Sequence, residues 1–100
     1  MSNLIGSSVT KAVRAVVSGR VQGVGFRQAT RSTARSLGLF GWVRNVWGEG
    51  TLEVWLQGDS EAVDRMLDWL WIGPPQAEVS GVESDVVAED RYLQDFLIRQ

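Results

Sequence analysis

The sequence contains neither cysteine nor histidine, and the two absences remove several classes of chemistry. Without cysteine the chain has no disulfide framework, no thiolate nucleophile and no thiolate metal ligand. Without histidine it lacks both the commonest general base near neutral pH and the usual nitrogen ligand of zinc. An enzyme of this composition needs a substrate that is already reactive, and we expect it to use no metal and no cofactor.

A strong charge of either sign is also missing, as are long apolar runs. Ten Lys and Arg residues against twelve Asp and Glu residues leave a formal net charge of −2, which argues against nucleic acid as a partner. No apolar run approaches the roughly 20 residues of a membrane span, and the first residues lack the pattern of a signal peptide. We therefore expect a soluble, cytoplasmic, monomeric protein without a membrane partner, with a flexible tail at 1–10 and one domain at 11–100.

Hydrophobic periodicity predicts a regular succession of strands and helices. Alternating apolar residues indicate strands at 11–18, 40–46, 51–57 and 78–86, and a short final strand at Phe96 and Ile98. A helical pattern at 26–37 ends at Gly38, and a second helix begins at Asp59 or Ser60 and ends before Gly73-Pro74-Pro75. The order βαββαβ is that of the ferredoxin-like α+β sandwich, an antiparallel sheet with two helices on one face.

A glycine-rich loop joins the first strand to the first helix. Gly19, Gly23 and Gly25 allow positive φ angles that turn backbone N–H groups inward, next to a helix N-terminus, where anions bind. Arg27 follows in the first helical turn, where its charge opposes the helix dipole and suits an anion. These residues alone leave a second interpretation open, an ordinary glycine-rich turn beside a solvated arginine. The spacing matches neither the Walker motif nor the dinucleotide fingerprint.

Two longer segments carry a resemblance to a known family. The sequences GRVQGVGFR at 19–27 and LGLFGWVRN at 37–45 resemble the two signature blocks of the acylphosphatases. The likeness continues through Gly73-Pro74-Pro75, Ala77 and Val79, and it covers about residues 11–98. It implies hydrolysis of the carboxyl-phosphate bond of acyl phosphates to a carboxylate and inorganic phosphate. It also implies that inorganic phosphate, as a product, inhibits the enzyme.

The resemblance also implies roles for particular residues. Arg27 corresponds to the arginine that binds the phosphate in the family, together with loop amides that correspond to Val21, Gln22, Gly23, Val24 and Gly25. Asn45 corresponds to the asparagine that orients the attacking water, so Arg27 and Asn45 are the expected catalytic residues. Strand alternation agrees, because Asn45 shares a face with Val43 and faces the helices if Val43 does. The turn at 46–51 is one residue longer than is usual in the family.

The chemistry needs few groups, because the carboxylate of an acyl phosphate leaves without a proton. Neutralising the phosphoryl charge and placing a water molecule in line are sufficient. The alternative is a non-catalytic ferredoxin-like module that binds an anion or nucleic acid; an anion sensor would have no use for a water-orienting Asn45. A domain that handles carbamoyl phosphate in a larger assembly is a third possibility, which the short chain disfavours. Trp42 and Trp55 are expected on the sheet face away from the helices, as a cover for the sheet or as an apolar patch.

Overall fold

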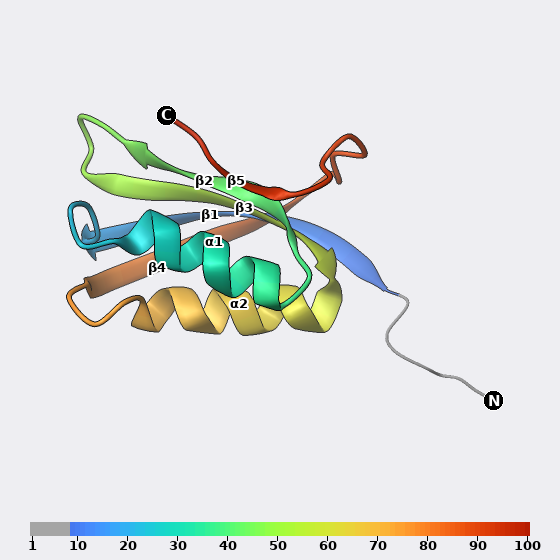
Figure 1. Ribbon diagram of the computed structural model, residues 1–100, viewed down its shortest axis with the longest axis horizontal. Coiled ribbons are helices and arrows are strands. Elements are labelled where there is room, and N and C mark those ends of the chain that lie inside the picture. Colours follow the sequence, from blue (N-terminus) through green and yellow to red (C-terminus); the bar gives the residue numbers. More distant parts are fainter. Residues whose placement is uncertain (1–8) are drawn as a thin grey trace.

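Two helices cover one face of a five-stranded sheet in the computed structural model, which describes residues 9–100 (Figure 1). The strands are β1 (Thr10–Arg20), β2 (Phe40–Val46), β3 (Thr51–Asp59), β4 (Glu78–Val87) and β5 (Phe96–Ile98), and the helices are α1 (Phe26–Ser36) and α2 (Ser60–Ile72). The predicted βαββαβ order and the helices on one face are confirmed. Residues 1–8 of the predicted tail lie outside the described residues.

Local hydrogen bonds mark the start of α2 and the end of α1. Asp59 precedes α2, and its carboxylate accepts a hydrogen bond from the Ala62 N–H at 3.1 Å, the usual bond of a capping aspartate. α1 ends at Ser36, and Gly38 follows with a φ of 71°. That left-handed conformation lets the Leu39 N–H reach the Ala34 carbonyl at 2.9 Å, which satisfies a carbonyl of the last helical turn.

The strands lie in the order β4-β1-β3-β2-β5, and the four long ones pair antiparallel as predicted. The short β5 instead pairs with β2 in parallel, so the sheet as a whole is mixed. The chain leaves β4 at one edge of the sheet and crosses to the opposite edge, where β5 lies beside β2. Gln57 holds this crossover: its side-chain amide donates to the Asp90 carbonyl at 2.9 Å and accepts from the Asp90 N–H at 2.8 Å.

The hydrophobic core lies between the sheet and the two helices. The sheet contributes alternate residues of β1, β2 and β3, all of them at most 3% exposed: Val13, Ala15, Val17, Val43, Leu52, Val54 and Leu56. The helices contribute Phe26, Thr30, Ala34, Val63, Met66 and Leu70. Thr30 is a polar residue in this core, and its hydroxyl donates to the Phe26 carbonyl at 2.7 Å, so its burial leaves no donor unpaired.

The opposite face of the sheet carries charged and aromatic side chains. Glu53 is 7% exposed and accepts hydrogen bonds from Arg14 and Arg44 on the flanking strands. Trp42 and Trp55 stack beside them with ring centres 6.2 Å apart, which confirms their predicted face. Burial raises the pKa of Glu53, but the hydrogen bonds and charges of Arg14 and Arg44 outweigh burial, so this pKa lies below its ordinary value.

Gly41 in β2 leaves no room for a side chain against β3. Its φ is 147°, and a Cβ placed there would lie 1.8 Å from the Trp55 carbonyl oxygen. We expect Gly41→Ala to lower the free energy of unfolding by at least about 2 kcal/mol, because backbone and neighbour must both move. Urea unfolding measures this. Gly81→Ala is the control, since a Cβ at Gly81 meets nothing within 4 Å; an equal loss in both variants would contradict the explanation.

Glu53→Gln should destabilise the fold in a pH-dependent manner. A carboxyl whose pKa is lowered by folding stabilises the protein above its unfolded pKa, and this stabilisation disappears as the pH falls through the folded pKa. We expect the variant to lose about 1–3 kcal/mol near pH 7, because two arginines lose a charged acceptor. Urea unfolding of both proteins below the folded pKa should give a much smaller difference. A difference that does not change with pH would contradict the assignment.

Candidate active site

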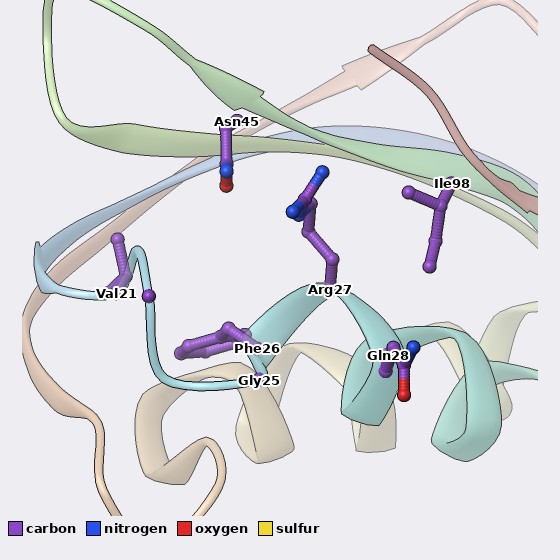
Figure 2. A pocket seen from close by; sticks show the side chains of 8 residues that line it. Val21, Gly25, Phe26, Arg27, Gln28, Asn45 and Ile98 are labelled. Carbon is purple, nitrogen blue, oxygen red and sulfur yellow. The ribbon is translucent and has the colours of Figure 1, made fainter.

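A pocket of about 350 Å³ opens beside the N-terminus of α1, between the glycine-rich loop and the sheet (Figure 2). Four segments contribute to it: the loop between β1 and α1, the first turn of α1, β2 and β5. Its lining residues are Val21, Gly23, Gly25, Phe26, Arg27, Gln28, Asn45 and Ile98.

The loop is anchored to the core by its apolar side chains. Val21 and Val24 are 1% and 9% exposed, so their burial attaches the loop to the core. The loop backbone at Gly23 and Gly25 lines the pocket. Gly23 and Gly25 have φ values of 75° and 78°, and a Cβ at either position would meet nothing within 4 Å. Glycine is therefore needed here for backbone conformation rather than for space.

The N-terminus of α1 offers an uncompensated positive end. Gly25 is the N-cap and supplies no side-chain hydrogen bond, and the first turn contains no acidic residue. An α-helix leaves its first N–H groups without intrahelical partners, so these donors remain available to an anion. Arg27 lies in the same turn, half-buried, and within residues 9–100 it has no hydrogen-bond or ion-pair partner. Both contributions make the electrostatic potential at this end of the pocket more positive.

Asn45 faces the pocket from the opposite side. It lies on the helix-facing side of β2, as strand alternation predicts, and is 4% exposed. Its Oδ1 atom is buried and has no hydrogen-bond partner in the described part of the chain. Figure 2 shows the side chains of Asn45 and Arg27 extending toward one another across the pocket. A buried acceptor without a partner costs about 1–3 kcal/mol, so a donor such as water is favoured beside it.

The structure brings together most of the residues predicted for the site. Five line the pocket, namely Val21, Gly23, Gly25, Arg27 and Asn45. Gln22 and Val24 do not: the Val24 side chain packs in the core, and the Gln22 side chain turns toward the β2–β3 hairpin.

Sequence analysis missed three lining residues: Phe26, Gln28 and Ile98. Phe26 and Gln28 are the neighbours of Arg27 in the first helical turn, so the motif itself was a signal for them. Ile98 had no comparable signal, because it reaches the pocket only through its parallel pairing with Val43.

Among residues 9–100, no group of three His, Cys, Asp or Glu side chains is placed to hold a metal ion. None of the helices in this range has the length and apolar character that crossing a membrane requires.

Comparison with known proteins assigns the family. The acylphosphatase family profile matches residues 13–98, which is most of the chain. The chain belongs to the acylphosphatase family. An acylphosphatase from Nitrosococcus oceani is 47% identical over 87 residues, which cover 87% of this chain and 96% of the relative. Another, from Acaryochloris marina, is 51% identical over 73 residues, covering 73% of this chain and 77% of the relative.

Solved structures agree with the sequence relatives. An acylphosphatase from Coxiella burnetii has a TM-score of 0.85 at 39% identity, covering 90% of this chain and 93% of that chain. Full-length HypF in its phosphate- and nucleotide-bound form contains a similar segment, with a TM-score of 0.82 at 26% identity. That match covers 92% of this chain but only 12% of HypF. The predictions of a ferredoxin-like fold and of an acylphosphatase are thus confirmed.

The position of Arg27 at the pocket can be tested by its effect on phosphate binding. We expect Arg27→Ala to weaken the binding of inorganic phosphate by about tenfold or more, because a charged two-pronged donor is lost. Arg27→Lys should recover little of the phosphate affinity, since an ammonium group cannot bind two oxygens in one plane. Calorimetric titration with phosphate measures both. Arg31→Ala is the control, because it removes the same charge one helical turn further along, outside the pocket lining. Equal losses for Arg27→Ala and Arg31→Ala would show that net charge, not geometry, binds the anion.

Proposed function

We propose that this chain hydrolyses acyl phosphates, with Arg27 and the backbone amides of residues 21–25 holding the phosphoryl group and Asn45 orienting the attacking water. The observation that carries the proposal is the buried, unpartnered Oδ1 of Asn45 in a pocket otherwise suited to an anion. An acceptor oxygen repels an anion unless a donor lies between them. A water molecule between Asn45 and the phosphoryl group meets this requirement, whereas a site that only binds anions gains nothing from the acceptor.

The positive groups supply the electrostatic part of catalysis. The phosphoryl oxygens lie against the loop amides and the free N–H groups at the start of α1, and the Arg27 guanidinium binds two of them. The amide donors are fixed by the backbone and by the buried Val21 and Val24, so they do not have to reorganise as charge shifts during the reaction. Positioning and charge stabilisation are the main requirements of phosphoryl transfer, and the pocket provides both.

The reaction proceeds in one displacement. The water oxygen held by Asn45 attacks phosphorus, while the bond from phosphorus to the carboxyl oxygen breaks on the opposite side. The carboxylate leaves as an anion and needs no general acid, which suits a chain without histidine. The proton of the attacking water passes to a phosphoryl oxygen, so acyl phosphate and water become a carboxylate and inorganic phosphate.

Two further expectations follow from the proposed mechanism. Inorganic phosphate fits the same amides and Arg27, so it should compete with the substrate. The mechanism requires side chains from one chain only, and we expect the enzyme to act as a monomer.

Asn45→Ala tests the mechanism most directly. Asn45 is assigned to the water rather than to the phosphate, so kcat should fall by about 10²-fold or more while phosphate inhibition changes little. Asn45→Asp should be no better, because its carboxylate brings a negative charge toward the phosphoryl group. Release of phosphate from benzoyl phosphate measures kcat. Loss of phosphate inhibition with a normal kcat would make Asn45 a binding residue and overturn the mechanism.

A further inference from the structure

The Gln22 side chain connects the phosphate loop to the hairpin between β2 and β3. Its Nε2 donates to the Thr51 carbonyl at 3.0 Å and to the Val46 carbonyl at 3.3 Å. Val46 and Thr51 are cross-strand partners, the last pair before the hairpin turn. One side-chain amide therefore bonds both strands of the hairpin at once, from a loop that lies 24 residues earlier than Val46 in the chain.

Of the two carbonyls that Gln22 contacts, that of Val46 is rigidly held and adjacent to Asn45. Val46 directly follows Asn45 in β2. Its carbonyl also accepts hydrogen bonds from the N–H groups of Glu49 and Gly50 in the turn, at 3.2 and 3.1 Å. A displacement of this carbonyl relative to the loop therefore displaces Asn45 as well.

The loop does not depend on Gln22 for its own shape. Val21 and Val24 on either side of it are buried, and Gly23 and Gly25 provide the required positive φ angles. The Gln22 amide instead spans the distance between the loop and β2, which are the two parts of the site.

We propose that Gln22 is a positioning residue, whose side chain fixes the distance between the phosphate loop and Asn45. The inference rests on the proposed function, because it concerns the alignment of the bound phosphoryl group with the water held by Asn45. Phosphoryl transfer requires this alignment, and a misplacement of about 1 Å can cost 10²-fold in rate. The side chain suits the task, since a glutamine amide carries two N–H donors and two carbonyls face it.

Gln22→Met keeps the length of the side chain and removes its donors. We expect kcat for benzoyl phosphate to fall about tenfold or more, because the water and the phosphoryl group lose their alignment. The inhibition constant of inorganic phosphate should change less than about twofold, because the amides and Arg27 remain. A parallel loss of kcat and of phosphate binding would overturn the proposal, since Gln22 would then shape the anion site itself.

Gln57→Met is the matched control for a merely structural effect. Gln57 also links two segments through its amide, but it bonds Asp90 and lies at the other end of β3 from Thr51. We expect Gln57→Met to lower the melting temperature while leaving kcat unchanged. If the two variants lower kcat equally, general loosening explains Gln22→Met and the proposal is wrong.

A double-mutant cycle separates this inference from the proposed function. If Gln22 acts through Asn45, then Gln22→Met should cause no further loss of kcat in an Asn45→Ala background. Fully additive losses would overturn the positioning role while leaving the function of Asn45 intact. A normal kcat in Asn45→Ala alone would instead overturn the proposed mechanism.

Gln22→Glu provides a second variant with a different readout. Its carboxylate would face two carbonyl oxygens, so kcat should be low at neutral pH. Protonation restores one donor, so the ratio of the variant's kcat to that of the wild type should rise on acidification. A ratio independent of pH would contradict the hydrogen bonds on which the proposal stands.

Discussion

The site depends on one constraint, which is the burial of Phe26 of α1 and Val43 of β2 in the core between the helices and the sheet. Phe26 is 1% exposed and starts α1, and Val43 is fully buried in the middle of β2. Burying such a side chain contributes about 1.5–3 kcal/mol, which leaves little freedom for its neighbours. Arg27 is the residue after Phe26, and Asn45 lies two positions after Val43 on the same face. The core thus sets the positions of both groups that face each other across the pocket.

The pocket itself contains groups that folding alone does not satisfy. The positive end of α1 has no capping side chain, Arg27 is unpaired within residues 9–100, and Asn45 presents an acceptor without a partner. Of the three, the buried acceptor of Asn45 is unfavourable as long as it has no donor beside it. Under the proposed function, these groups would hold a phosphoryl anion with a water molecule beside it. The surrounding core, which is apolar and closely packed, keeps these groups from collapsing onto one another.

The two faces of the sheet carry different kinds of contact. On the helix side, Asn45 is the last of the alternate β2 residues that face the helices. On the other side, Glu53 joins Arg14 and Arg44 across three adjacent strands, and Arg99 lies with its guanidinium 4.9 Å from the Trp42 ring centre. A slip of one residue in the register of β2 would move Asn45 to the wrong face and break this network at once. The ionic and aromatic contacts of the outer face therefore hold the register that the inner face requires.

The sequence by itself determined the element order, the glycine-rich loop and the face on which Asn45 lies, because these follow from local periodicity and backbone preferences. It also sufficed to predict Arg27 beside a helix N-terminus, since nine consecutive residues contain that whole unit. Only the tertiary structure decided that β5 pairs in parallel with β2 and brings Ile98 to the pocket. The same holds for the direction of the Gln22 side chain, because sequence analysis considered only the backbone amide of Gln22, as one of the expected phosphate-binding amides. Both depend on contacts between segments distant in the chain, and no local pattern encodes which carbonyls a glutamine will meet once the strands have paired.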